Sequence, residues 1–208
     1  MEDLKKVEIP ADWANAVDNS VADKAEGNGA LVEYVNEILK PVNAYKGNKL
    51  PVSTFMDHVD GTAPNGSAAY EKRGIAVDVP EWNPENCIQC NQCSFVCPHA
   101  VVRPFLVNAE EAKNAPEGVQ YLAPTGKGFE GLQYTLQIST LDCTGCEVCV
   151  NTCPGKKGEK ALKMVPISDA LEAGQAVNAK YFFDNVTYKE NLVDKMANPK
   201  NSQFAQPL

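Results

Sequence analysis

The chain has no cysteine outside two short segments, only two histidines and no hydrophobic run long enough to cross a bilayer. A membrane span needs about 18 or more apolar residues. The opening MEDLKKVEIP also lacks the apolar region of a signal peptide. No Ser-centred nucleophile elbow is present, and the glycines of PTGKGFEG lack the spacing of a phosphate loop. We therefore expect no membrane attachment, no serine-hydrolase chemistry and no P-loop nucleotide site.

Acidic residues outnumber basic ones by 27 to 19, which gives the 208 residues a formal net charge of −8. Nucleic acid is a polyanion, so this balance argues against it as a partner. The cysteines lie too close along the chain for a disulfide framework and leave no thiol over for a single bridge. Free thiols indicate a reducing compartment, and we expect the protein to be cytoplasmic.

All eight cysteines belong to two copies of one pattern, CIQCNQCSFVCP from Cys87 and CTGCEVCVNTCP from Cys143. The spacing C-x2-C-x2-C-x3-C-P is that of bacterial two-cluster ferredoxins. In these proteins three cysteines of each motif bind one 4Fe-4S cluster, and the fourth binds the other cluster. The pattern predicts electron transfer through two low-potential clusters with exchanged ligands. Cluster one would take Cys87, Cys90, Cys93 and Cys153, and cluster two would take Cys143, Cys146, Cys149 and Cys97.

Structural zinc is the alternative for these cysteines, because zinc sites also use C-x2-C pairs. A third cysteine two residues further on and a proline after the fourth cysteine argue against zinc. Small residues such as Thr144 and Gly145 would let backbone amides approach sulfur, and Pro98 and Pro154 would redirect the chain after the fourth ligand.

Other candidate residues have weaker support. His99 could form a hydrogen bond near a cluster or satisfy a local backbone group. His58 receives no catalytic role, since no nucleophile accompanies it. A positive patch beside the second motif could dock an acidic partner or be a solvated loop. This patch consists of Lys156, Lys157, Lys160 and Lys163.

Strand-like segments flank both motifs, which predicts an α+β fold with a ferredoxin-like core, a pseudo-two-fold repeat and extended terminal arms. The segments are 75–82, 101–107, 132–140 and 161–167. A long insertion, 108–131, is rich in Gly, Pro, Glu and Asn and predicts a surface excursion. We expect an amphipathic helix from Ala30 to Lys40, with Asn28 as its cap and Pro41 as its stop.

We expect three parts along the chain. Residues 1–66 would form an N-terminal arm and a linker domain that contains the helix. Residues 67–183 would form the two-cluster domain, and residues 184–208 would form a C-terminal linker.

Beyond the cysteines, several stretches resemble pyruvate:ferredoxin (flavodoxin) oxidoreductase. They are LPVSTF at 50–55, DGTAPNGSAAYEKRGIAVDVPEW at 60–82, the first cysteine motif, and NSQFAQPL at 201–208. The resemblance implies a fragment that covers the internal two-cluster domain and its preceding linker domain. Its last residues would lead toward a thiamine-diphosphate domain that the chain lacks.

By resemblance, the parent enzyme converts pyruvate and coenzyme A to acetyl-CoA and carbon dioxide and passes electrons to ferredoxin or flavodoxin. Thiamine diphosphate, Mg²⁺ and a third 4Fe-4S cluster would belong to the parent, so this chain alone is not expected to turn over pyruvate. Other domains of the parent would be its partners. Two alternatives remain open: a ferredoxin-like protein or subunit of another anaerobic oxidoreductase, and an interaction scaffold that its clusters hold together.

Overall fold

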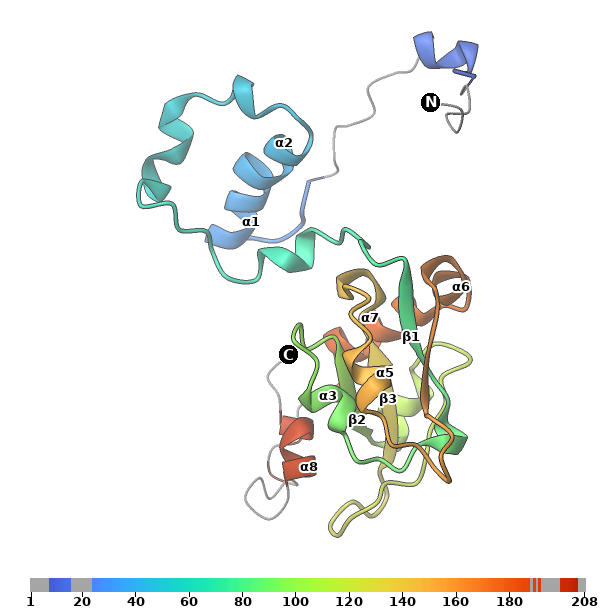
Figure 1. The fold of residues 1–208 in the computed structure, drawn as a ribbon. Helices are drawn as coiled ribbons and strands as arrows, with labels where there is room; N and C mark the ends of the chain where they lie inside the picture. Colours follow the sequence, from blue (N-terminus) through green and yellow to red (C-terminus); the bar gives the residue numbers. More distant parts are fainter. Residues whose placement is uncertain (1–7, 16–23, 188, 190, 192–198, 206–208) are drawn as a thin grey trace. The chain divides into compact units, whose positions relative to one another are not determined.

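The computed structural model describes residues 8–15, 24–187, 189, 191 and 199–205 (Figure 1). The chain divides into an N-terminal unit, Met1–Glu71, and a C-terminal unit, Lys72–Leu208. Parts of the predicted arms, residues 1–7, 16–23, 192–198 and 206–208, lie outside the described residues. In the described parts of the chain, none of the helices combines the length and apolarity needed to traverse a bilayer.

The N-terminal unit contains one continuous helical stretch that begins at Ala30, as the apolar pattern predicts. It consists of α1 (Ala30–Tyr34), a π-helical turn η2 (Val35–Leu39) and α2 (Lys40–Asn43). Its buried side chains are Val35 and Ile38. The other regular elements in the described part of this unit are short 3-10 helices: η1 (Ala11–Asn15), η3 (Gly47–Lys49), η4 (Val52–His58) and η5 (Ser67–Tyr70).

Two sequence predictions about this helix are wrong. Pro41 does not end it, because the π-helical turn comes directly before the proline and the helix continues to Asn43. A wider turn relieves the clash between a proline ring and the carbonyl one turn earlier. The N-cap is Gly29 rather than Asn28, and no side chain caps the first turn. Gly29 has a φ of 105°, a conformation that glycine adopts without strain.

The C-terminal unit is built on two antiparallel pairs of strands, and each predicted strand segment contains one of them. β1 (Asp78–Trp82) pairs with β4 (Leu162–Pro166), and β2 (Val102–Val107) pairs with β3 (Gln133–Ile138). The first strand thus pairs with the last, so each cysteine motif connects one sheet to the other. Alternation in the sequence places the strands, but their partners are set by packing between distant segments.

Short helices surround these sheets. α3 (Gln92–Phe95) and α5 (Val148–Thr152) belong to the cysteine motifs and contact each other. α6 (Ile167–Glu172) and α7 (Gln175–Asn185) follow the last strand. α8 (Pro199–Ser202) and η9 (Gln203–Ala205) form the last described segment, and η9 contacts β2. The main core consists of strand residues such as Val79, Val102, Tyr134, Leu136 and Leu162.

The insertion between the motifs is only partly a surface excursion. It begins with α4 (Ala109–Lys113), which a capping box between Asn108 and Glu111 starts. Leu122 forms a β-bridge with Tyr134, and Phe129 is buried. Val119 and Tyr121 also pack against a second core cluster that contains Phe182. The insertion is therefore anchored on the core at several points.

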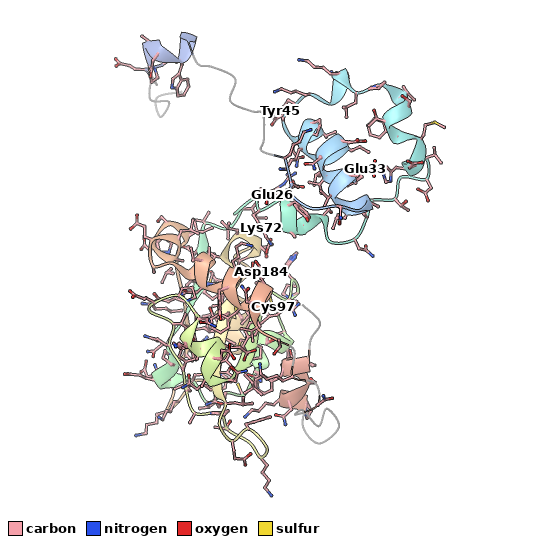
Figure 2. All side chains as sticks on the ribbon, turned by 180° about the vertical axis from the view of Figure 1, so that it is seen from behind. Glu26, Glu33, Tyr45, Lys72, Cys97 and Asp184 are labelled. Atoms are coloured by element: carbon pink, nitrogen blue, oxygen red, sulfur yellow. The ribbon has the colours of Figure 1, made fainter. Side chains whose placement is uncertain are left out.

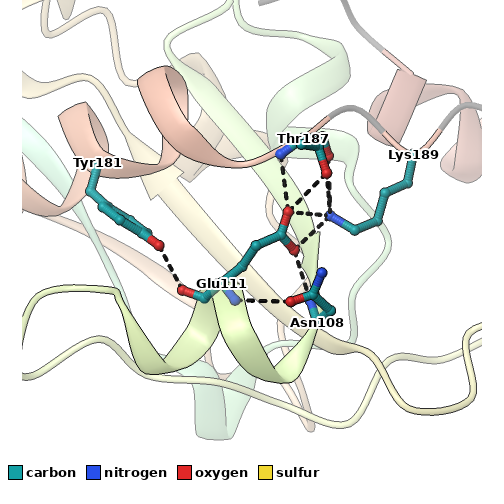
Figure 3. A network of polar contacts seen from close by, with 5 residues as sticks. All are labelled: Asn108, Glu111, Tyr181, Thr187 and Lys189. Atoms are coloured by element: carbon teal, nitrogen blue, oxygen red, sulfur yellow. Dashed lines mark hydrogen bonds and ion pairs between the residues drawn. The ribbon is translucent and has the colours of Figure 1, made fainter.

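Glu111 joins the insertion to the chain that follows α7 (Figure 3). Its carboxylate accepts hydrogen bonds from Lys189 Nζ at 2.7 Å and from the Thr187 backbone N–H at 3.0 Å. Both members of the Lys189–Glu111 ion pair are nearly buried, with 12% and 11% of their side chains exposed. Burial alone would raise the pKa of Glu111, but the hydrogen bonds from Lys189, Asn108 and Thr187 outweigh it and lower that pKa below its ordinary value of 4.5.

Substituting Glu111→Gln should weaken this network, because it leaves the Lys189 ammonium nearly buried without its counter-charge. We expect the free energy of unfolding to fall by about 2 kcal/mol at neutral pH. This corresponds to a lower midpoint of thermal unfolding by about 6 °C. Since the folded-state pKa is lowered, the contribution is present above the unfolded-state pKa and is lost as pH falls through the folded-state value. The stability difference between the unsubstituted protein and Glu111→Gln should therefore shrink as pH falls below the ordinary carboxyl pKa of 4.5.

The measurement is anaerobic thermal unfolding of the iron-loaded protein across this pH range. Glu110→Gln is the matched control, because Glu110 is the exposed neighbour on the same helix. Equal shifts in the two variants would show that the ion pair does not stabilise the fold.

Candidate metal centres

The two cysteine motifs have the same local backbone course. Each begins at the end of a 3-10 turn, η6 (Pro84–Asn86) before Cys87 and η7 (Thr140–Asp142) before Cys143. Two and four residues after that cysteine, the backbone is left-handed, and a short helix with the third cysteine follows. The left-handed residues are Gln89 (φ 56°), Asn91 (φ 57°), Gly145 (φ 69°) and Glu147 (φ 62°). These conformations curl each loop so that its first three cysteines line one cavity.

The first cavity leaves about 330 Å³ free of protein atoms. It is lined by three cysteines of the first motif and by one of the second: Cys87, Cys90, Cys93 and Cys153. The other lining side chains are mostly apolar or aromatic and include Trp82, Tyr134, Leu136 and Leu162. We call this cavity site one.

The second cavity leaves about 340 Å³ free. It is lined by three cysteines of the second motif and by one of the first: Cys143, Cys146, Cys149 and Cys97. Cys97 lies among the side chains of the C-terminal unit (Figure 2). Val101, Val102 and Met164 contribute apolar lining. We call this cavity site two. The structure thus groups the cysteines as a ferredoxin-type exchange requires, while iron ligation itself stays a prediction.

Hydrogen-bond donors surround the sulfur atoms. The backbone N–H of Gln89 donates to Cys87 Sγ, and that of Gly145 donates to Cys143 Sγ, each over 3.4 Å. The indole Nε1 of Trp82 is buried in the wall of site one and has no hydrogen-bond partner among the described residues. Donors of this kind suit a sulfur-rich anionic group. The residues present therefore fit an iron-sulfur cluster.

Among the residues that the structure describes, no three His, Cys, Asp or Glu side chains form a site for a single metal ion. Each cavity instead has four thiols around a shared volume. A 4Fe-4S cluster requires this arrangement, because each cysteine ligates a different iron.

The cavities also set the protonation of the cysteines. Burial raises the pKa of Cys87, Cys93 and Cys143, and it raises the pKa of Cys149 to about 11. Without iron these thiols keep their protons at neutral pH. Cluster binding must displace the protons, because thiolates are the ligands.

Site one is covered by segments from elsewhere in the chain. Gln89 Nε2 donates to the Ala123 carbonyl at 2.7 Å, and Gln89 Oε1 accepts from the Thr125 N–H at 2.9 Å. Both partners belong to the insertion. Asn91 accepts from Tyr134 OH at 2.9 Å and donates to the Lys200 carbonyl at 3.0 Å.

The C-terminal segment completes this cover. Ser94 Oγ donates to Gln203 Oε1 over 3.0 Å, and the Phe204 ring contacts Tyr134 with 6.1 Å between centroids. Sequence reasoning assigned residues 184–208 to a linker and did not identify these contacts. The polar residues Gln89, Asn91 and Ser94 inside the first motif are the only signal for them, since buried polar side chains require partners.

Site two is more open. Cys146 is exposed, as are its neighbours Thr144 and Glu147, whereas Cys90 at the matching position of the first motif is half-buried. His99 lines site two from an exposed position. His58 lies in the N-terminal unit, where its ring packs edge-on against Tyr34 and contacts the Thr62 carbonyl.

The predicted lysine patch does not present four unpaired charges. Lys163 forms an ion pair with Glu81 at 3.0 Å, and Lys160 Nζ donates to the Val150 carbonyl at 2.7 Å. Lys156 and Glu159 form a backbone bridge. These contacts favour the interpretation as a structured, solvated loop.

Comparison with family models defines the class. The model of a 4Fe-4S double cluster binding domain matches residues 86–156, which contain all eight cysteines. A domain of unknown function, EKR, matches residues 21–76. The chain carries a 4Fe-4S double cluster binding domain, and its C-terminal unit is a small fold of mixed helices and sheets around it.

The chain also matches larger proteins over its whole length. It is 44% identical over 213 residues to the pyruvate:ferredoxin oxidoreductase of Moorella thermoacetica, covering 100% of this chain and 17% of the relative. It is 42% identical over 208 residues to the pyruvate-flavodoxin oxidoreductase of Klebsiella pneumoniae, again covering 100% of this chain and 17% of the relative. The mitochondrial pyruvate dehydrogenase [NADP(+)] of Euglena gracilis is 40% identical over 206 residues, 98% of this chain and 10% of the relative.

These matches confirm the resemblance predicted from the sequence. The chain corresponds to one section of the pyruvate:ferredoxin and pyruvate-flavodoxin oxidoreductases, and it spans 17% of the length of the first two relatives.

Proposed function

We propose that this chain relays electrons through two 4Fe-4S clusters, one in each cavity. The observation that carries the proposal is the grouping of the cysteines, three from one motif and one from the other around each cavity. Cluster one would be held by Cys87, Cys90, Cys93 and Cys153. Cluster two would be held by Cys143, Cys146, Cys149 and Cys97.

A bound 4Fe-4S cluster supplies reversible one-electron chemistry, and the protein sets how easily it occurs. Leu136 and Leu162 at site one, and Val101 and Val102 at site two, shield part of each cavity from water. Backbone N–H groups of Gln89 and Gly145 stabilise negative charge on sulfur. The helices that carry Cys93 and Cys149 contact each other, which supports electron exchange between the sites.

The proposal includes a pseudo-two-fold repeat. Each half would consist of a strand, a 3-10 turn, a cysteine loop, a short helix and a second strand. The matching left-handed positions in the two loops support it, because Gln89 and Gly145, like Asn91 and Glu147, occupy equivalent places in the cysteine spacing.

In a larger enzyme the chain would be the relay section. The names of its relatives specify pyruvate oxidation with ferredoxin or flavodoxin, and on this basis we propose the same reaction for the parent of this chain, with either carrier as acceptor. Thiamine diphosphate, Mg²⁺ and a third cluster would bind elsewhere in that parent. The three parts would be 1–66, 67–183 and 184–208, and eight free cysteines suit the cytoplasm.

Anaerobic reconstitution with iron and sulfide tests this function. We expect about eight irons and eight sulfides per chain. An EPR-monitored redox titration should show two reduced centres whose signals interact. Colourless protein that binds zinc would overturn the assignment, and clusters that cannot be reduced would favour the scaffold. Pyruvate alone should not reduce a dye through this chain.

A further inference from the structure

Trp82 differs from the rest of the site-one wall because it brings a hydrogen-bond donor. It is the last residue of β1 and lines the cavity beside Cys87, Cys90 and Cys153. Its indole Nε1 is buried and has no hydrogen-bond partner among the described protein atoms. Buried donors in folded proteins are nearly always paired, so an unpaired donor in a cavity wall indicates an acceptor inside the cavity.

The ring of Trp82 is held firmly against this cavity. Its strand position is paired with Leu162 of β4, and the following Asn83 N–H donates to the Ala161 carbonyl at 2.8 Å. Tyr134 packs edge-on against the indole with 6.1 Å between the ring centroids and 65° between the ring planes. These contacts restrict the directions in which the N–H can point.

Sulfur is the acceptor that this cavity offers the N–H, because four thiols line it: Cys87, Cys90, Cys93 and Cys153. The thiolate is the form that binds iron. The indole N–H, unpaired among the described residues, therefore lies in the wall of a cavity that would hold anionic sulfur.

Site two has no equivalent of this donor at the matching strand position. Ile138 ends β3 before the second cysteine motif, as Trp82 ends β1 before the first. Its side chain is apolar and offers no N–H. The two sites therefore differ at this strand position, where site one has an N–H donor and site two has none.

Resting on the proposed function, we propose that Trp82 donates its indole N–H to a sulfur atom of the cluster at site one and raises the reduction potential of that cluster. A hydrogen bond to sulfur becomes stronger when reduction adds negative charge to the cluster, so it favours the reduced state. Trp82 is a positioning and tuning residue, since it holds no iron.

The test compares the two potentials in one molecule. Trp82→Phe keeps an aromatic ring and removes the donor. We expect the site-one potential to shift to a more negative value while the site-two potential stays unchanged. Cys146→Ala, which removes a predicted ligand of cluster two, assigns the signals. Unchanged potentials in a fully loaded Trp82→Phe protein would overturn the proposal.

A second measurement needs no change at Trp82. The chain has two tryptophans, and the other, Trp13, is 66% exposed in the N-terminal unit. In a Trp13→Phe background, nitrogen-15 labelling of indole marks Trp82 alone. Pulsed EPR of the reduced protein should detect magnetic coupling between this nitrogen and cluster one. Absence of coupling in protein that contains both clusters would also overturn the proposal.

If Trp82→Phe does not fold, an amino acid with the same ring shape but no N–H can replace Trp82. In the same Trp13→Phe background, benzothienylalanine replaces the indole N–H by sulfur and keeps the ring shape. It should give the same negative shift at site one. Failure of the proposed function would look different, because the unsubstituted protein would then contain no reducible cluster.

Discussion

Replacing Cys153 with alanine is expected to remove the cluster of the first cysteine motif, although Cys153 belongs to the second. Iron should fall from about eight to about four atoms per chain. The reason is that Cys153 lines the cavity of Cys87, Cys90 and Cys93, whereas the other cysteines of its own motif line site two. Iron analysis and EPR of the reduced protein measure the loss.

The same substitution should destabilise both halves of the C-terminal unit. A cluster that joins the two motifs closes a long loop, much as a cross-link does. We expect the midpoint of anaerobic thermal unfolding to fall by on the order of 10 °C.

Cys97→Ala is the reciprocal control, since Cys97 lies in the first motif and lines site two. It should remove the signal that Cys153→Ala leaves. Loss of the site-two signal in Cys153→Ala would mean that each motif binds its own cluster and that the ligand exchange is wrong.

Gly155→Ala should also strongly reduce the stability of the fold and the iron content of site one, although it changes no iron ligand. Gly155 lines site one next to Pro154 and has a φ of 61°. A Cβ at this position would lie 1.8 Å from the Glu159 carbonyl oxygen and 2.8 Å from Lys160 Cα. The contacted atoms are backbone, and the paired hydrogen bonds between Lys156 and Glu159, 2.9 and 3.0 Å long, restrict their movement.

The cost has two parts. A left-handed conformation costs a non-glycine residue about 1–2 kcal/mol. Relief of the clash requires the loop to move and adds about 1–3 kcal/mol. We expect the free energy of unfolding to fall by about 4 kcal/mol and site one to lose much of its iron, because the displaced loop also carries Cys153.

Gly158→Ala separates the two parts of this cost. Gly158 lies in the same loop with a φ of 90°, but an added Cβ there would meet no atom within 4 Å. In Gly158→Ala, we expect the free energy of unfolding to fall only by the cost of the left-handed conformation, about 1 kcal/mol, and site one to keep its iron. Thermal unfolding and iron content of both variants provide the measurement. Equal losses of stability and iron in the two variants would show that the close approach of residue 155 to Glu159 does not cause the effect of Gly155→Ala.

Local patterns predicted much of this molecule. The cysteine spacing marks the two metal-binding loops, and alternating residues such as Leu132, Tyr134 and Leu136 predict a strand that the structure contains as β3. Apolar spacing likewise predicts the helix from Ala30, but not its course past Pro41, which depends on a change of helical type. Patterns of this kind act between neighbours in the chain.

Features that depend on distant partners did not follow from the sequence. No local signal shows that β1 pairs with β4. The polar residues Asn91 and Ser94 indicate that partners are needed, but not that these partners are Lys200 and Gln203. In the sequence, Trp82 is one apolar strand residue among several. The structure places its N–H in the wall of site one, where no described residue accepts a hydrogen bond from it.

By itself, the sequence determined the number and spacing of the thiols and the course of each cysteine loop. The loops follow from the sequence because they curl through local backbone conformations, such as those of Asn91 and Gly145. The ferredoxin pattern also predicted which site each fourth cysteine joins. Only the tertiary structure decided which segments cover site one and that site two is more open. These properties depend on packing between segments far apart in the chain, as when the C-terminal segment covers site one and leaves Cys146 of site two exposed.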